Sequence, residues 1–364
     1  MTDLLHGLAR PLLFALPPEE AHEVTLRALE AGVYRRDGSP PDPRLAVEIA
    51  GLKFPNPVGI AAGFDKDARV PDAVLELGCG FAECGTVTPL AQTGNPRPRV
   101  FRLLAERAVI NRLGFNNGGH EAARQRLERR AAKPGIVGIN IGANKDSADR
   151  INDYVAGIEA FNAVAAYFMV NISSPNTTGL RRLQDPSALD LLLTRVMAAR
   201  AAVIAKGGPP RPVFVKIAPD IAADEIEPVC GQLEAHGVDG IAVSNTTLAR
   251  AGVKGPLARE GGGLSGAPLF LRSTVMLARV YQVTGGRIPL IGIGGIESGA
   301  AALAKIEAGA SLVQLYTGLI YEGAGLIGRI KRQLSAEVAK AGVSGIRGLT
   351  GRAAAAWAAK ALEE

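Results

Sequence analysis

Amide and ammonium side chains stand at or directly behind the ends of several short apolar runs of this chain. Lysine does so at Lys66 and Lys216, and asparagine does so at Asn140, Asn171 and Asn245. An asparagine carries a donor and an acceptor in one plane, while a lysine stabilises negative charge that develops during a reaction. These residue types therefore suit a planar, anionic, hydrogen-bonding ring.

Residue types that other chemistries require are missing from the same positions. Glycoside hydrolysis needs a pair of carboxylates, and the nearest acids, Asp65 and Asp67, flank Lys66. Two acids around a lysine do not form a cage for a hard cation. The four histidines all lie away from the ends of the runs. The sequence therefore predicts no metal site and no histidine base.

A glycine-rich turn, Gly292–Ile296 (GIGGI), precedes a helix that should begin near Ser298. The backbone N–H groups of such a turn, together with a helix N-terminus, commonly hold a phosphate group. Tyr316 and Thr317 follow the last apolar run, so we expect them beside this phosphate site. A second string, Gly323–Gly328 (GAGLIG), matches a dinucleotide fingerprint but does not open a strand–helix–strand unit. We expect no nicotinamide there, although its amides could add to the phosphate site.

Eight short runs recur from about residue 56, with helical stretches between most of them. Several are almost continuously apolar, as strands buried on both faces should be. Eight parallel strands with helical crossovers form a (β/α)8 TIM barrel of the α/β class, in which chemistry collects at the carboxyl ends of the strands. The expected strands are Val58–Ala62, Phe81–Thr88, Ile136–Ile141, Tyr167–Ile172, Val213–Ile217, Gly240–Asn245, Pro289–Gly294 and Leu312–Tyr316. The expected helices include Gly118–Ala132, Pro186–Ala205, Glu225–His236, Ser273–Val283 and Ser298–Ala308.

The chain divides into three segments by composition. Residues 1–36 predict an N-terminal helical extension, in which Pro17 and Pro18 start a second helix that ends at Gly32. Residues 37–55 predict a linker and barrel-bottom segment, because residues 37–43 read DGSPPDP. Residues 56–364 should form the barrel, with residues 99–110 as a hairpin over its mouth.

Composition narrows the class of protein. The chain has 364 residues, 44 glycines and only three cysteines, which excludes a disulfide framework and favours a reducing, cytoplasmic compartment. No apolar run reaches the roughly 18–20 residues of a transmembrane helix, and no cleavable secretory leader begins the sequence. The formal charge of +6 leaves a nucleic-acid surface open. However, the basic residues are scattered, with pairs such as Arg181-Arg182 expected on solvated faces, and aromatic residues are scarce.

Eight motifs lie at or near the ends of the expected strands and in the loops behind them: Ala61–Lys66 (AAGFDK), Gly85–Thr88 (GTVT), Asn111–Asn117 (NRLGFNN), Val170–Asn176 (VNISSPN), Val215–Asp220 (VKIAPD), Ser244–Thr247 (SNTT), Gly263–Gly266 (GLSG) and Gln314–Thr317 (QLYT). Together they resemble the dihydroorotate dehydrogenase family, and the resemblance covers essentially the whole chain. Two features of the sequence resemble those of the class 2, quinone-using branch of this family. Ser174 stands in the loop where class 1 enzymes carry cysteine, and the N-terminal helical pair is a class 2 feature. Ser244 stands where threonine is frequent in the family, a change that should keep the hydroxyl.

The resemblance implies one non-covalently bound FMN on the barrel mouth, with dihydroorotate stacked on its ring. Lys66 is expected to meet both molecules, and Lys216 to lie where reduction builds negative charge on the flavin. The residues implied in flavin binding are Ala62, Gly63, Lys66, Thr86, Asn140, Asn171, Lys216, Ser244, Gly266, Gly295, Tyr316 and Thr317.

The resemblance also implies which residues act on dihydroorotate. Ser174 should take a proton from C5 while a hydride passes from C6 to the flavin, and a serine needs dry surroundings and a proton path for that role. Thr177 is implied as the relay hydroxyl and Phe115 as the apolar wall. The residues implied in substrate binding are Lys66, Asn111, Arg112, Leu113, Gly114, Phe115, Asn171, Asn176, Asn245 and Thr246.

For residues 1–36 the resemblance implies a passage for a membrane quinone, lined in part by His22 and Arg102. The enzyme would then be peripheral, at the cytoplasmic face of the cell membrane, and would belong to pyrimidine biosynthesis. Apolar area rather than charge should drive the contact, because residues 1–36 hold four basic and five acidic side chains.

Alternatives remain open at this point. A class 1-like FMN enzyme would use fumarate or NAD, and another FMN barrel could act on pyrimidines. The phosphate turn alone would suit a phosphosugar isomerase, and the net charge alone a basic nucleic-acid-binding barrel. The sequence predicts neither the oligomeric state nor which quinone is used.

Overall fold

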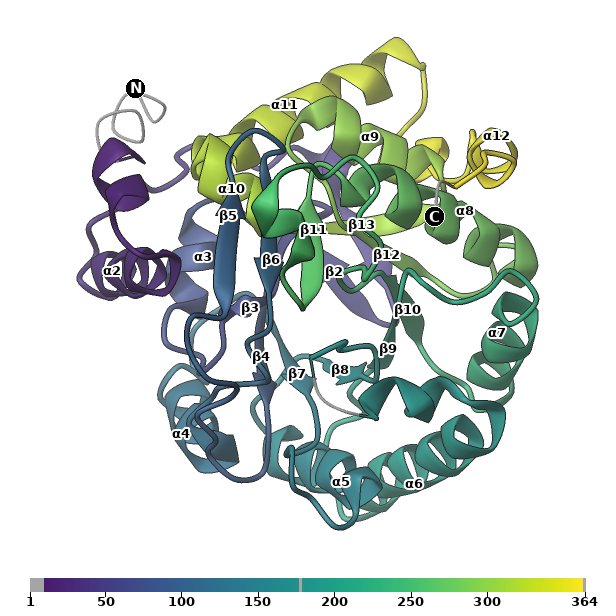
Figure 1. Ribbon diagram of the computed structural model, residues 1–364. Helices are drawn as coiled ribbons and strands as arrows, with labels where there is room; N and C mark the ends of the chain where they lie inside the picture. The colour runs from purple at the N-terminus through teal and green to yellow at the C-terminus, as the bar shows by residue number, and fades with distance from the viewer. Residues whose placement is uncertain (1–9, 177–178, 363–364) are drawn as a thin grey trace.

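Eight parallel strands close into a barrel whose outer face is covered by helices (Figure 1). The computed structural model describes residues 10–176 and 179–362. Neighbouring strands follow the order β10-β12-β13-β3-β4-β7-β8-β9. The predicted TIM barrel with an N-terminal helical extension is therefore confirmed. The barrel strands are β3 (Val58–Asp65), β4 (Phe81–Val87), β7 (Ile136–Ile141), β8 (Phe168–Asn171), β9 (Val213–Ile217), β10 (Gly240–Val243), β12 (Leu290–Ile293) and β13 (Ala310–Leu315).

The helices between the strands lie close to where the sequence predicts them. The longest, α6, has the predicted bounds, whereas α8 begins at Leu269 rather than Ser273. The earlier start of α8 follows from Pro268, which supplies a helical φ of −63° just before it. The helices are α3 (Pro71–Glu76), α4 (Gly119–Arg129), α5 (Arg150–Phe161), α6 (Pro186–Ala205), α7 (Ile226–Ala235), α8 (Leu269–Thr284), α9 (Gly299–Glu307), α10 (Thr317–Glu322), α11 (Gly325–Lys340) and α12 (Ala354–Ala358).

Aromatic rings fill the barrel towards the amino ends of its strands. Phe81, Tyr167 and Phe214 are buried, and the ring centroids of Tyr167 and Phe214 lie 5.1 Å apart. Each ring occupies the space that a side chain on a neighbouring glycine would take; a Cβ on Gly138 would lie 2.1 Å from Cζ of Tyr167. Some of the glycine excess therefore serves core packing rather than turns. The three glycines are Gly59, Gly138 and Gly240.

A three-stranded antiparallel sheet lies in front of the barrel in Figure 1. β5 (Val100–Leu103) and β6 (Ala108–Asn111) form the predicted hairpin. β11 (Gly263–Gly266), from the loop that follows β10, pairs with β6. The third strand was not predicted, because its pairing joins segments far apart in the sequence.

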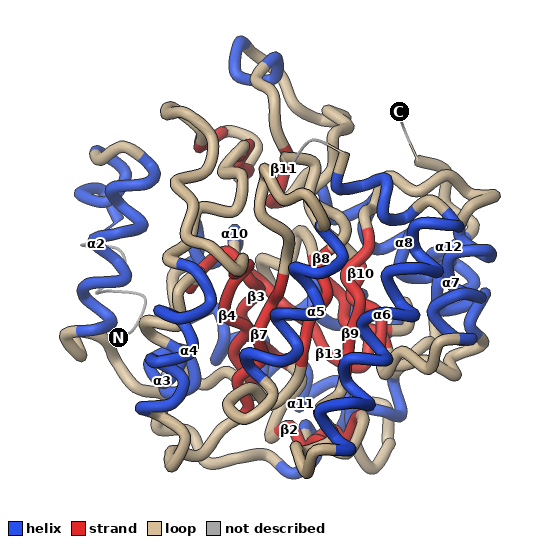
Figure 2. The backbone as a smooth tube through the Cα atoms, turned by 90° about the horizontal axis from the view of Figure 1, so that it is seen from below, coloured by secondary structure: helices blue, strands red, loops and turns tan. Residues whose placement is uncertain are grey.

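The N-terminal extension consists of helical residues 10–15 followed by α2 (Pro18–Glu30). Residues 1–9, which the prediction also assigned to this extension, lie outside the described residues. Pro18 opens α2 and acidic residues occupy its first turn, as predicted. Figures 1 and 2 both show α2 at the side of the barrel, near α3.

Charged side chains attach α2 to the barrel. Arg69 pairs with Glu23 and Glu30, each at 2.7 Å. Arg99 pairs with Glu19 at 2.9 Å, and only 6% of the Arg99 side chain is exposed. Leu26 and Leu29 add apolar contact with the core. The helix is therefore held by both ion pairs and packing.

Short elements complete the fold. β1 (Val47–Ile49) and β2 (Leu52–Phe54) form an antiparallel pair within the predicted linker and barrel-bottom segment. The ring of Phe54 lies 5.2 Å from that of Phe81, so this pair closes the aromatic end of the barrel. The 3-10 helices are η1 (Pro43–Leu45), η2 (Leu180–Gln184), η3 (Pro256–Arg259) and η4 (Ile346–Leu349).

Candidate active site

A cavity of about 1270 Å³ opens at the carboxyl ends of the barrel strands and continues beneath α2. Its walls come from the strand ends, the loops behind them, the three-stranded sheet and the N-terminal helices. The fold thus brings together residues spread over most of the chain. The predicted site residues that line it are His22, Ala62, Gly63, Lys66, Thr86, Arg102, Asn111, Leu113, Gly114, Phe115, Asn171, Ser174, Asn176, Lys216, Ser244, Asn245, Thr246, Gly266, Gly295, Tyr316 and Thr317.

Two predicted site residues, Asn140 and Arg112, are placed differently, and a third is not described. Asn140 is fully buried and is not among the residues that line the cavity; its Oδ1 accepts a hydrogen bond from Thr86 at 2.6 Å. The side chain of Arg112 also stays out of the lining and donates to Glu260 at 2.6 Å. Asn140 and Arg112 would therefore act on a ligand only through their neighbours. Thr177 lies outside the described residues.

Two lysines line the cavity, Lys216 buried and Lys66 partly buried. The Nζ of Lys66 donates to the carbonyl of Gly63 at 2.9 Å. Burial lowers the pKa of Lys66 to about 8, against an opposing effect of Asp67. Burial also lowers the pKa of Lys216, and the carboxylate of Glu83 opposes that change. Because so little water surrounds them, either ammonium would interact strongly with an anion placed beside it.

A continuous row of hydrogen bonds crosses the floor of the cavity. The Oγ1 of Thr86 donates to Asn140 and accepts from the Nδ2 of Asn171 at 3.0 Å. Ser173 Oγ donates to the Oδ1 of Asn171 at 3.0 Å, and Asn245 Nδ2 donates to Ser173 Oγ at 3.0 Å. One amide hydrogen of Asn171 therefore pairs with Thr86, and its second is left for a ligand.

The loop after β8 carries Ser174 into the cavity. Ser174 is 5% exposed, and its Oγ accepts from the backbone N–H of Asn176 at 3.3 Å. The Nδ2 of Asn176 donates to Asn111 at 3.3 Å, which links the loop to the hairpin. Phe115, at a φ of +54°, supplies an apolar part of the wall. Ser174 therefore lies in surroundings with little water.

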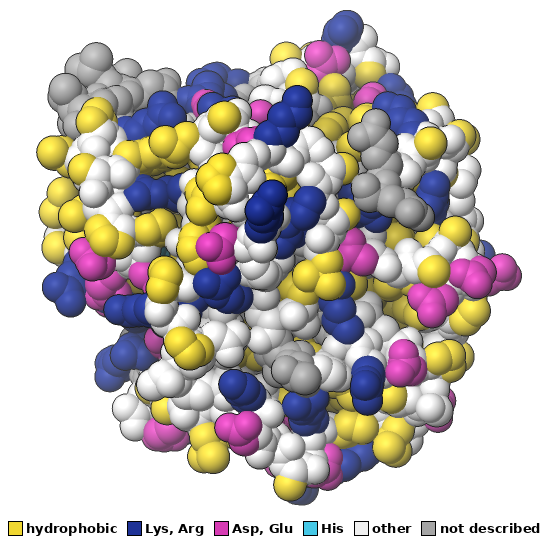
Figure 3. All heavy atoms as spheres, in the orientation of Figure 1, with side chains coloured by type: hydrophobic (Ala, Val, Ile, Leu, Met, Phe, Trp, Pro, Cys, Tyr) yellow, Lys and Arg dark blue, Asp and Glu magenta, His cyan; other side chains and the backbone are white. Residues whose placement is uncertain are grey.

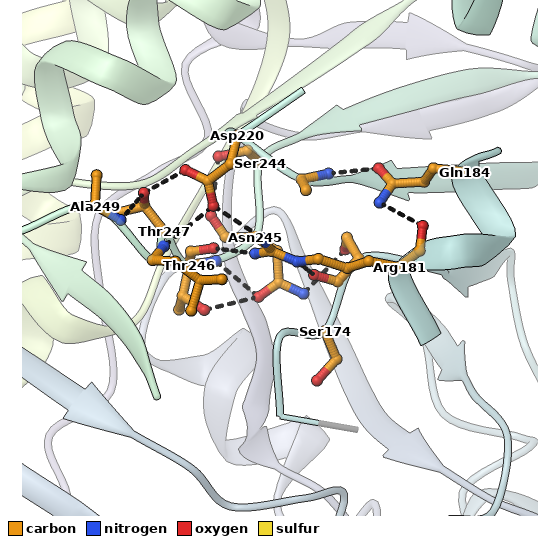
Figure 4. Close-up of polar contacts among 12 residues, drawn as sticks. Ser174, Arg181, Gln184, Asp220, Ser244, Asn245, Thr246, Thr247 and Ala249 are labelled. Carbon is orange, nitrogen blue, oxygen red and sulfur yellow. Dashed lines mark hydrogen bonds and ion pairs between the residues drawn. The ribbon is translucent and has the colours of Figure 1, made fainter. Parts of the chain in front are cut away.

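Arg181 supports this loop, and the sequence did not predict that role. Its guanidinium donates to Asp220 at 2.9 Å, to the carbonyl of Thr246 at 3.0 Å and to the carbonyl of Ser173 at 3.2 Å (Figure 4). It thus ties together the loops behind β8, β9 and β10. The expectation that Arg181 lies on a solvated face was wrong, because the three loops fold around its side chain.

Bare backbone forms the cavity wall next to β12 and β13. Gly295 has a φ of +72°, and a Cβ there would lie 2.4 Å from Cβ of Phe270. A Cβ on Gly266 would lie 2.3 Å from the carbonyl oxygen of Arg107. Neither position accepts a side chain, so backbone groups remain close to a ligand. The first residues of α10 and α11 line the same wall, which could hold a phosphate.

Beneath α2 the cavity becomes more aromatic. The ring of His22 lies 5.6 Å from that of Phe64 and 6.1 Å from that of Tyr316. Burial, with a smaller contribution from Lys66, lowers the pKa of His22 to about 3, so its imidazole is neutral. The guanidinium of Arg102 lies 4.9 Å above the ring of Phe14. This end of the cavity suits an apolar, ring-bearing ligand.

The cavity can therefore hold a planar, carbonyl-bearing ring over its polar floor, with an anion at the glycine wall. It also contains residues that the sequence did not predict, including Gln314 and Ser265. Gln314 was overlooked because it stands inside an otherwise apolar strand. Among residues 10–176 and 179–362, no group of His, Cys, Asp and Glu could hold a metal ion.

Comparisons with known proteins agree on one family. The sequence matches the family described as "Dihydroorotate dehydrogenase" over residues 44–338. It is 57% identical, over the full length of both chains, to proteins named "Dihydroorotate dehydrogenase (quinone)" from Brucella ovis and Brucella canis. The fold is similar to the ligand-free DHODH of Eimeria tenella, with a TM-score of 0.88 and 37% identity over 92% of this chain and 99% of that one. The Eimeria tenella DHODH in complex with ferulenol gives a TM-score of 0.87 at 36% identity, over 94% of this chain and 98% of that one.

Proposed function

Because this chain belongs to the dihydroorotate dehydrogenase family, we propose that it oxidises (S)-dihydroorotate to orotate through a bound FMN and passes the electrons to a membrane quinone. The observation that carries the proposal is the single cavity, which joins a polar floor holding Lys66, Lys216 and Ser174 to an aromatic end beneath α2. Two chemically different substrates can thus approach one site. The reaction would serve pyrimidine biosynthesis.

The residues of the cavity fit FMN. The oxygen Oε1 of Gln314 is buried without a hydrogen-bond partner among the described residues, and Lys216 brings a positive charge to the same cavity. The isoalloxazine ring has both N–H and carbonyl groups that could meet them, and the bare backbone at Gly266 and Gly295 could receive its phosphate. When bound, FMN supplies a two-electron acceptor. The flavin-binding set we propose is Ala62, Gly63, Lys66, Thr86, Asn171, Lys216, Ser244, Gly266, Gly295, Tyr316 and Thr317, with Asn140 acting through Thr86.

Ser174 is proposed as the base that takes the proton from C5 of dihydroorotate. Its burial keeps water from the reacting carbon, and Phe115 extends the apolar wall. Asn111, Asn171 and Asn176 offer amide groups to the carbonyls and the carboxylate of the substrate. Leu113, Gly114, Asn245, Thr246 and Lys66 complete the proposed substrate site, and Thr177 stays the proposed relay. Arg112 would act only by holding its chain neighbours Asn111 and Leu113, which line the cavity.

Residues 1–36 are proposed to guide quinone and to touch the membrane, with residues 37–55 as the link to a barrel of residues 56–364. His22 and Arg102 line the aromatic end of the cavity. Leu12, Val24 and Val33 are exposed, and apolar side chains gather at the side of the molecule where α2 lies (Figure 3). In the part of the chain that the structure describes, no helix is long and apolar enough to cross a membrane. We therefore propose peripheral contact at the cytoplasmic face of the cell membrane.

The test is a pair of half-reactions. The purified protein should show flavin absorbance that dihydroorotate bleaches without oxygen and that a ubiquinone analogue restores. Restoration by fumarate or NAD but not by the quinone analogue would move the chain to a class 1-like function. A protein without flavin, or one whose flavin dihydroorotate does not reduce, would contradict the proposal.

A further inference from the structure

A buried carboxylate, Glu83 on β4, lies below the floor of the cavity and is not part of its lining. It is 2% exposed. Its Oε1 accepts from the Nδ2 of Asn140 at 2.8 Å, and its Oε2 accepts from the hydroxyl of Tyr167 at 3.0 Å and the Nε2 of Gln314 at 2.8 Å. Both carboxylate oxygens thus accept hydrogen bonds from donors on neighbouring residues. The partners of Glu83 therefore all turn donors towards it.

The first consequence concerns Gln314 on β13. Because its Nε2 is given to Glu83, its Oε1 must point elsewhere. Gln314 is fully buried, lines the cavity, and has no partner for this oxygen within the described part of the chain. A buried acceptor without a partner is costly and rare. The position therefore favours a ligand that brings a donor.

The second consequence runs along the row of hydrogen bonds. Because Asn140 gives its Nδ2 to Glu83, its Oδ1 must accept the hydroxyl hydrogen of Thr86. The Oγ1 of Thr86 is then left as an acceptor for the Nδ2 of Asn171. Asn171 therefore presents its remaining N–H, not its carbonyl, to the cavity.

We propose that Glu83 is a positioning residue that fixes, from below the cavity, the orientation of Gln314 and Asn140. Gln314 thereby offers an acceptor to the FMN ring, and Asn171 offers a donor to the substrate. The inference rests on the proposed function, since it assigns these two groups to FMN and to dihydroorotate. An isoalloxazine ring carries an N–H at its edge, which is the kind of donor that Gln314 lacks.

Substituting Glu83→Gln puts an N–H2 group where only an acceptor satisfies the neighbours. Reversal of Gln314 resolves that conflict most easily, because its unpaired Oε1 then gains a donor. Reversal of Asn140 would instead leave the Thr86 oxygen facing two donors and its hydrogen without an acceptor. In E83Q we therefore expect Gln314 to present N–H2 to the cavity, while Asn171 keeps its orientation.

The experiment is a double-mutant cycle on the FMN dissociation constant, measured from the flavin that diluted holoenzyme releases at equilibrium. E83Q and Gln314→Leu should each weaken FMN binding by about tenfold or more, because each removes the acceptor. The double variant should be no more than about twofold weaker than Gln314→Leu alone, because the two changes act through one group. The exchange variant E83Q with Gln314→Glu should recover FMN affinity, since amide and carboxylate have changed places.

The orientation of Asn171, which depends on Asn140 and Thr86, is tested by measuring orotate binding to the flavin-loaded proteins. E83Q should keep the orotate dissociation constant within about threefold, whereas Asn140→Leu, which cuts the row but leaves Glu83, should raise it about tenfold. A general structural disturbance would not separate the two ligands in this way.

Additive losses in the cycle, wild-type FMN affinity in Gln314→Leu, or wild-type orotate affinity in Asn140→Leu would each overturn the inference. Gln314→Leu and Asn140→Leu can still overturn the inference if E83Q fails to fold. The wild-type protein is the first arm of the experiment: if it carries no flavin that dihydroorotate reduces, the proposed function fails instead. If dihydroorotate does reduce the flavin of the wild-type protein but the losses in the cycle are additive, the proposed function stands and only the proposed role of Glu83 is refuted.

Discussion

Arg99→Met should loosen α2 while leaving the barrel folded. Arg99 is 5% exposed and donates to Glu19 and to the carbonyls of Thr93 and Asn95, the latter two at 2.6 and 2.8 Å. Methionine keeps most of the side-chain volume but removes every donor. The variant leaves Glu19, whose side chain is only 21% exposed, beside Arg97, which is 71% exposed and 3.4 Å away. Breaking a buried pair costs about 3–5 kcal/mol, and the partial exposure of Glu19 places the cost near about 3 kcal/mol.

The melting temperature converts that cost into a measurement. The entropy of unfolding is about 2.1 cal/mol/K per residue, so a chain of 364 residues loses about 4 °C for 3 kcal/mol. Stopped-flow assays should then find flavin reduction by dihydroorotate within about twofold of wild type, but slower reoxidation by a quinone analogue, since α2 lines only that end of the cavity.

The matched control is Arg27→Met, on the exposed face of the same helix. Arg27 pairs with Glu23, but its side chain is 74% exposed, so the change should cost less than about 0.5 kcal/mol. Adding Glu19→Gln to Arg99→Met should recover about 1–2 kcal/mol by removing the stranded charge. Equal stability of the two methionine variants, or equal slowing of both half-reactions, would refute the reasoning.

Three further outcomes follow from the same geometry. Ser174→Ala should bind orotate normally but reduce its flavin about 100-fold more slowly in single-turnover experiments; an unchanged rate would show that another group is the base. Gly138→Ala should lower the urea-derived stability by about 3 kcal/mol, because the new Cβ would lie 2.1 Å from the ring of Tyr167, whereas Gly231→Ala, with open space around it, should not. His22 has a folded pKa of about 3, below its ordinary value of 6.5. Between pH 6.5 and pH 3 His22 is therefore protonated in the unfolded chain but not in the folded one. The free energy of unfolding should decrease as the pH is lowered through this range, by about 2 kcal/mol at pH 5 relative to neutral pH. His22→Asn should lack this part of the pH dependence, and an equal acid sensitivity in both proteins would contradict the assignment.

Strand and helix positions could be predicted because they depend on local signals. Runs buried on both faces are mostly apolar, as in β7 and β9, and the polar residues near their carboxyl ends, Asn140 and Lys216, mark the edge where sites form. The hairpin of β5 and β6 is likewise a local structure. The pairing of β11 with β6 and the contacts of Arg181 depend on loops that meet only in the folded chain, so no local pattern could indicate them.

The polar layer of the barrel shows a different limit. Glu83 and Gln314 stand inside strands that are mostly apolar, and a large polar residue there was visible in the sequence as an exception. The sequence did not show what these polar residues contact, because Asn140 lies on β7 and Tyr167 directly before β8, and only the closed barrel brings them together. A carboxylate inside an apolar strand therefore deserves to be examined as a possible anchor for polar groups on neighbouring strands, since burying it without donors would be prohibitive.

Net charge was the only observation that favoured a nucleic-acid partner, and the arrangement of the basic side chains in the structure does not support one. Surface arginines such as Arg36, Arg124 and Arg287 pair with nearby carboxylates. Basic side chains are scattered among acidic and apolar ones on the face shown in Figure 3, without forming a stripe. The charges that meet a ligand at the polar floor of the cavity are instead those of Lys66 and Lys216. Because buried charges interact with a ligand far more strongly than hydrated ones do, two such lysines outweigh the formal excess of +6 in deciding what this protein binds.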